Sequence, residues 1–269
     1  MAKSNIALNN ENQPPNKTIY AIVYFLSYIT LGMSTAVLGP MLSQIGDSVS
    51  VSLGVVSLLL AIKATGYFIG SVGSGRIFDR FSGHKIQVIA ISLMTLCMLL
   101  IPLTKSFIFI IFIMVFLGMM EGTLDVGGNT LLLWKFKSNV APYMNGLHFF
   151  FGLGAFIAPL IVANVLHFDS SLRWTFWLVG IIFIPSIIGF AFLPSPIPSK
   201  KTEVKDKLTV KKTVIILIVI LFFTYVGTEL SFGSWIYTYS LKSNLTNETT
   251  SAYLTSAFWG ALTIGRLLG

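Results

Sequence analysis

Long apolar runs separated by short polar segments dominate the chain. Each run is near or above the roughly 20 residues that a helix needs to cross a bilayer. The pattern therefore predicts an all-α membrane protein with eight spanning helices. The runs cover residues 19–40, 51–74, 86–103, 107–134, 142–166, 173–193, 213–240 and 250–268.

The fourth run carries three polar side chains on one helical face. Glu121, Asp125 and Asn129 recur at i, i+4 and i+8, a spacing that stacks side chains along one side of a helix. Each acid at a bilayer centre costs roughly 2.5–3.5 kcal/mol, whereas each large apolar residue contributes only about 0.3–0.6 kcal/mol. We therefore expect this face to look into protein or water and to line a polar pathway. A structural polar contact between helices is the alternative interpretation.

Lys63 is predicted to lie near the centre of the second run, at about the depth of Glu121. A lysine stem is too short to reach either membrane surface from that depth. We therefore expect a buried ion pair with Glu121 or Asp125, which would neutralise one acid and leave the other available for coupling. A role in structure or gating and a contact with substrate both remain open for Lys63.

The seventh run carries a third intramembrane acid. Glu229 shares a helical face with Tyr225, Gly233 and Tyr237. Aromatic rings beside a carboxylate suit a sugar, because a ring face covers C–H surface while the hydroxyl groups find acceptors. An acid close to a helix end is the alternative.

The fifth run places His148 on one face with Asn145 and Gly152. A histidine in an apolar helix can bind a ligand or transfer a proton, and it can equally be a satisfied packing residue. Both interpretations of His148 stay open.

Composition and charge agree with a membrane protein. Hydrophobic residues make up 54% of the chain, charged residues 10%, and the mean hydropathy is +0.81, which excludes a soluble domain. The net charge is +8, and the loop lysines and arginines concentrate in one set of loops, with only Lys105, Arg173 and Lys242 in the opposite set. This asymmetry places the N-terminus and the loop near 194–212 in the cytoplasm. Because these basic residues flank membrane spans, a nucleic-acid partner is not expected. The single cysteine, Cys97, excludes an internal disulfide.

Residues 194–212 are rich in proline and charge and form the one clear linker. The predicted organisation is a cytoplasmic tail at 1–18, a six-helix bundle at 19–193, a cytoplasmic linker at 194–212 and a partial bundle at 213–269. Glycosylation sequons begin at Asn244 and Asn247 in an outward loop and at Asn16 in the tail, and their use is left open.

A short repeat indicates two related halves. The second run ends with Ile69 and Gly70, and the eighth ends with Ile264 and Gly265, each followed by small or basic residues. Repeated halves are common in transporters, and a second half of equal size would add four more spans. We interpret the chain as a truncated product, an isoform or an incomplete gene model.

The loop after the second run carries a family motif. Gly75, Asp79, Arg80 and Gly83 resemble the loop signature of the major facilitator superfamily, with one extra residue and with His84 where the family has a basic residue. Segments 63–71, 125–134, 148–154 and 225–229 are similar to the branch that holds sodium-dependent glucose transporters and fucose permeases.

This resemblance implies the major facilitator fold, with a complete six-helix N-terminal half and the first two helices of the C-terminal half. It implies a secondary transporter that moves a sugar or similar polar solute by alternating access, coupled to sodium or a proton, with no other cofactor. Asp125 and Asn129 match the acid and amide of the branch, and a sodium ion would bind at Asp125 or Glu121. The resemblance assigns gating to Gly75, Asp79, Arg80 and Gly83, although the helix that Asp79 would face belongs to the missing part. The expected substrate and ion site comprises Asp125, Asn129, Glu121, Glu229, His148, Asn145, Tyr225 and Lys63.

Other function classes fit less well. An intramembrane aspartyl protease needs two aspartates, and the predicted spans hold only Asp125, so an enzyme is not expected. A receptor does not fit a cytoplasmic N-terminus. The serious alternative is a truncated facilitator that is inactive alone and acts structurally or on a full-length partner. The expected partners are the lipid bilayer, most simply the plasma membrane, and a small solute of the monosaccharide kind, with the oligomeric state open.

Overall fold

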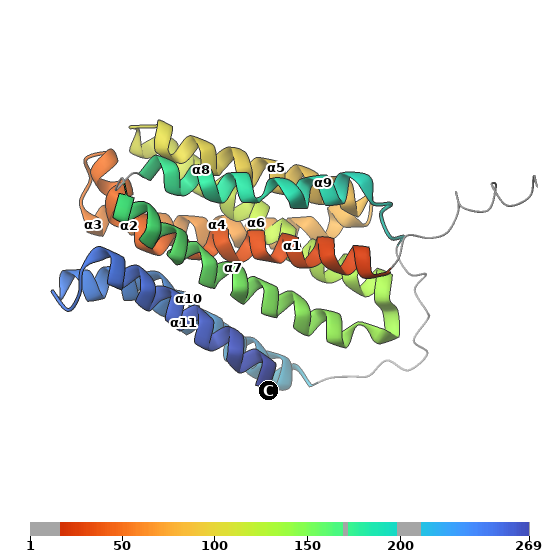
Figure 1. Cartoon of the computed structure of the whole chain (residues 1–269). Coiled ribbons are helices and arrows are strands. Elements are labelled where there is room, and N and C mark those ends of the chain that lie inside the picture. The colour runs from red at the N-terminus through yellow and green to blue at the C-terminus, as the bar shows by residue number, and fades with distance from the viewer. Residues whose placement is uncertain (1–16, 169–171, 198–210, 269) are drawn as a thin grey trace, which may run out of the picture.

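A computed structural model describes residues 17–168, 172–197 and 211–268, and every element within them is a helix (Figure 1). Most of the predicted tail at 1–18 and of the predicted linker at 194–212 lies outside the described residues. The helices are α1 (Lys17–Ala36), α2 (Leu38–Ser48), α3 (Leu53–Val56), α4 (Leu58–Phe78), α5 (Gly83–Leu100), α6 (Phe107–Phe136), α7 (Ala141–Phe168), α8 (Leu172–Ile182), α9 (Ile184–Phe192), α10 (Lys212–Lys242) and α11 (Glu248–Leu268), with 3₁₀ turns η1 (Ile101–Leu103) and η2 (Lys137–Asn139).

Seven of the described helical segments are long and apolar enough to cross a membrane. The expected all-α membrane fold is therefore confirmed. Helix α11 is 21 residues long but is not one of these seven segments, because its sequence interleaves hydroxyl and charged side chains with apolar ones. An eighth span at 250–268 stays a prediction.

Three runs that the hydropathy pattern predicts as continuous are each divided into two helices. The first run changes from α1 to α2 at Val37, and Pro40 lies in the first turn of α2. The sixth run changes from α8 to α9 at Phe183, where Pro185 occupies the first turn of α9. A proline in a first turn removes no helical hydrogen bond, so it favours a new helix start. In the second run the side chain of Ser52 caps α3 before α4 begins.

The helices pack side by side as a bundle. Helix α4 packs closely against α6, α1 packs against α7, and α5 contacts α6, α8 and α9. Figure 1 shows α10 and α11 on the side of the bundle away from α5, where α11 packs along α7 and α10 packs against α11 and α2. Large fully buried side chains fill the interior between these helices, among them Tyr24, Tyr28, Phe176, Phe183, Phe190 and Trp259.

Glycines allow the backbones of α4 and α6 to meet. A Cβ atom added at Gly66 or Gly70 of α4 would collide with a backbone carbonyl of α6, and one at Gly118 or Gly122 of α6 would collide with a backbone carbonyl of α4. Small residues at a spacing of four are the usual means of close helix approach in membranes. This contact fixes the rotation of α4 relative to the polar face of α6.

We expect Gly70→Ala to destabilise the bundle, because the new methyl group meets the backbone of Met119. Overpacking of this kind costs about 1–3 kcal/mol, and it can be measured as a lower thermal midpoint in detergent micelles. Gly73→Ala is the matched control, since a Cβ atom at Gly73 meets nothing within 4 Å. Equal midpoints for the two variants would contradict close packing at Gly70.

Candidate functional site

The polar face of α6 lies at the middle of the bundle. Glu121 is the fifteenth of the thirty residues of α6, and Asp125 and Asn129 follow one and two turns later. Glu121 is buried, and the other two are half-buried. Their partners come from α1 and α4, which pack against this face.

Asp125 is held by three neutral donors. The hydroxyl of Tyr28 donates to Oδ1 of Asp125 over 2.8 Å, and the hydroxyl of Tyr67 donates to Oδ2. The side-chain amide of Asn129 donates to Oδ1 over 3.2 Å and to the hydroxyl of Tyr28 over 2.8 Å. Helices α1, α4 and α6 therefore converge on one carboxylate.

The Asp125 cluster has the chemistry of a cation or proton site. Every side chain that contacts the carboxylate is a hydrogen-bond donor. Within the described parts of the chain, Asp125 forms no ion pair. A half-buried carboxylate without a counter-ion can accept a proton or a cation, and the adjacent hydroxyls can exchange hydrogen bonds with a polyol.

Glu121 has a different environment, one turn away from Asp125. Nζ of Lys63 lies 2.9 Å from Oε1 of Glu121, and both side chains are largely buried. The hydroxyl of Ser34 donates to the same oxygen over 2.5 Å, while Lys63 also donates to the Ser34 carbonyl over 3.4 Å. Of the two acids that Lys63 was expected to reach, the structure selects Glu121.

The third acid, Glu229, is paired within the last two helices. Nη2 of Arg266 on α11 lies 2.9 Å and 3.2 Å from the two carboxylate oxygens of Glu229 on α10. Nη1 of Arg266 also donates to the backbone carbonyl of His148 on α7 over 3.3 Å. This ion pair therefore connects α10 and α11 to the N-terminal bundle.

The remaining predicted residues of the site lie at its edge. The ring of His148 packs edge-on against Tyr28, with 6.4 Å between ring centroids, so it reaches the Asp125 cluster through that tyrosine. Asn145 and Tyr225 are exposed. The structure thus brings Asp125 and Asn129 together, pairs Glu121 with Lys63, and places Glu229 in a separate pair.

The predicted gating loop joins α4 to α5. Asp79 and Arg80 follow the end of α4 and are exposed, and Gly75 has open space around it. Gly83 begins α5 and packs against the side chain of Leu131 on α6. In the portion of the chain that the structure describes, Asp79 forms no ion pair.

Sequence reasoning missed four side chains that complete these clusters. Tyr67 lies four residues after Lys63, on the same face of α4, and Tyr28 belongs to a stripe with Tyr20 and Tyr24 on α1. These spacings were the available signals for the two tyrosines. Ser34 and Arg266 are further partners, and Arg266 was interpreted only as part of a repeat.

Comparisons with known proteins agree with this architecture. The profile of the Major Facilitator Superfamily matches residues 24–269. The chain is 29% identical over 272 residues to sodium-dependent glucose transporter 1 of Homo sapiens, which covers 87% of this chain and 52% of that protein. It is 29% identical over 259 residues to the Xenopus laevis protein of the same name, covering 85% and 52%. A glucose/mannose transporter of Bacillus subtilis is 22% identical over 264 residues, covering 93% and 64%.

The chain spans about half the length of the vertebrate relatives. The matched family and the names of these relatives place it with transporters rather than with enzymes. Its apolar helices make it a multi-pass membrane protein. Because the family profile covers nearly the whole chain, this protein belongs to the Major Facilitator Superfamily.

Proposed function

We propose that this chain provides the site of a secondary transporter that moves a sugar or similar polyol, with a proton or sodium as the coupling ion at Asp125. The observation that carries the proposal is the difference between the two acids of α6. Glu121 is neutralised by Lys63, whereas Asp125 is surrounded by neutral donors. Of the three acids on α6 and α10 that the structure describes, Asp125 alone can change its charge without breaking an ion pair.

The site also offers groups for a substrate with several hydroxyls. The tyrosine hydroxyls and the amide of Asn129 can both donate and accept hydrogen bonds. Relatives of the chain are named as glucose and glucose/mannose transporters, which supports a monosaccharide.

Transport would proceed by alternating access, in which the two halves move around the midplane site. Arg266 on α11 is bonded both to Glu229 on α10 and to the backbone carbonyl of His148 on α7. Such a movement would change this set of contacts. A cytoplasmic N-terminus belongs to the same proposal and rests on the distribution of basic residues. A plasma-membrane location is proposed with it.

The direct test is uptake of labelled glucose by proteoliposomes that contain the purified chain. We expect accumulation above the outside concentration when a sodium or proton gradient is imposed, and competition by unlabelled mannose. The two gradients are imposed separately, so the result identifies the coupling ion. Uptake that requires addition of a full-length relative would favour the alternative that the chain acts on a partner. Bound sugar that never accumulates under either gradient would contradict ion-coupled transport.

A further inference from the structure

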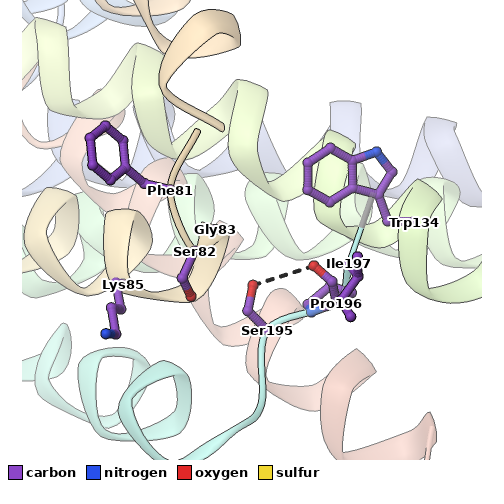
Figure 2. A pocket seen from close by; sticks show the side chains of 8 residues that line it. All are labelled: Phe81, Ser82, Gly83, Lys85, Trp134, Ser195, Pro196 and Ile197. Atoms are coloured by element: carbon purple, nitrogen blue, oxygen red, sulfur yellow. Dashed lines mark hydrogen bonds between the residues drawn. The ribbon is translucent and has the colours of Figure 1, made fainter. Parts of the chain in front are cut away.

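Two neighbouring cavities open at the end of the bundle where α5 begins and α9 ends. The first has a volume of about 430 Å³, and Figure 2 shows Phe81 and Trp134 on opposite sides of it. The second has a volume of about 560 Å³ and runs between Val88 and Ile89 of α5 and Ala191 of α9. Both volumes fall in the range of roughly 300–1,000 Å³ that is typical of ligand pockets.

The two cavities share a polar centre. Ser82, Lys85 and Ser195 line both of them. Lys85 and Ser82 are exposed, and among the described residues Lys85 forms no ion pair. The centre therefore offers an unpaired positive charge and hydroxyl donors to a ligand.

His84 holds the wall of the second cavity in place. Its Nδ1 lies 2.9 Å from the carbonyl of Leu193, and its Nε2 lies 2.9 Å from the hydroxyl of Tyr24. The backbone N–H of His84 donates to the hydroxyl of Ser195 over 3.3 Å. Since His84 is only 2% exposed, the segment after α9 is fixed against α5 before any ligand arrives.

We propose that this place binds an anionic glycerophospholipid, with its phosphate at Lys85, Ser82 and Ser195 and one acyl chain along the groove between α5 and α9. The class of ligand follows from the order in which polar and apolar groups line the site. The polar centre lies at the helix ends, and the apolar walls made by Val88 and Ile89 lie one turn further along α5. A lipid has the same order, with a charged headgroup followed by a hydrocarbon chain.

The positive charge of Lys85 selects anionic over zwitterionic headgroups. Basic side chains near a membrane surface attract anionic lipids, and one such charge changes the affinity about fivefold. Ile89 has 59% of its surface exposed, so the groove is open to an acyl chain from the side of the bilayer. This binding site is independent of the proposed transport function.

The test is native mass spectrometry of the whole chain in detergent, titrated with dioleoyl phosphatidylglycerol or dioleoyl phosphatidylcholine. We expect tighter binding of phosphatidylglycerol, and a loss of about fivefold in that affinity in Lys85→Gln. Lys212→Gln is the matched control, because Lys212 is also exposed but begins α10 and does not line either cavity. Ile89→Trp, which fills the groove, is expected to weaken both lipids.

Three results would overturn this site. The first is equal binding of the two lipids, or equal losses in Lys85→Gln and Lys212→Gln. The second is an Ile89→Trp variant that binds both lipids like the unaltered chain. The third is that water-soluble glycerol 3-phosphate displaces the lipid and binds with the same affinity as the lipid. The polar centre would then be a phosphate site in which the acyl chain has no role.

Discussion

Lys63→Met is expected to destabilise the bundle by about 3–5 kcal/mol, because it leaves the buried carboxylate of Glu121 without its counter-ion. Ser34 would remain as a hydrogen-bond donor to Glu121, but a hydroxyl does not neutralise a charge. The measurement is the free energy of unfolding of the purified chain in micelles, from denaturant titration. Methionine keeps the length of the lysine stem, so the change in packing is small.

The double variant Lys63→Met with Glu121→Gln separates the ion pair from the packing. With both charges removed, the glutamine can accept from Ser34 and donate to the carbonyl that Lys63 vacates, so we expect most of the stability to return. Lys105→Met is the control, because it makes the same change at an exposed loop position. Its free energy of unfolding should stay within about 0.5 kcal/mol of that of the unaltered chain. A double variant as unstable as Lys63→Met would show that uncompensated charge is not the cause.

The fold was predictable from the sequence wherever hydropathy and length decide the structure. The fourth run appears as α6 and the fifth as α7, with ends within about two residues of the expectation. The breaks at Val37 and Ser57 were not predicted, because mean hydropathy is unchanged across a short interruption. Such breaks depend on caps and turn residues, which are weak signals inside apolar runs.

The site was predictable along one helix but not between helices. The spacing of Glu121, Asp125 and Asn129 fixes their common face on α6, because helix geometry alone determines it. The partners Tyr28 and Tyr67 come from helices whose rotation is set by backbone contacts such as those at the glycines of α4 and α6. A single sequence does not specify those rotations.

The depth of Lys63 in the membrane predicts its ion pair, because only the length of a side chain and the thickness of a bilayer enter the prediction. It required an acidic partner and left two candidates, and the contact with Glu121 resolves the choice. For Glu229 the sequence predicts no counter-ion, and the structure supplies Arg266. That arginine lies near the end of α11, where basic residues are usually interpreted as topology signals.

Asp125→Asn is expected to abolish ion-driven accumulation of sugar while membrane insertion and folding stay intact. The amide keeps the shape of the side chain, and the hydroxyl of Tyr67 can turn to accept from the new NH₂ group in place of donating to the carboxylate. What the variant loses is the charge that would bind a proton or sodium ion. One coupling charge moving through 100 mV is worth about 2.3 kcal/mol, which permits up to about 50-fold accumulation of sugar by the unaltered chain. In Asp125→Asn the ratio of inside to outside sugar concentration should fall to about one.

The comparison of accumulation with sugar exchange distinguishes a coupling role for Asp125 from a structural one. In proteoliposomes without a gradient, exchange of labelled for unlabelled sugar needs the substrate site but no net movement of the coupling ion. We therefore expect Asp125→Asn to retain exchange, whereas a variant with a collapsed site would lose both activities. Asp47→Asn makes the same change at an exposed acid of α2 and should leave both activities unchanged. Gradient-driven accumulation at the unaltered level in Asp125→Asn would remove this residue from coupling.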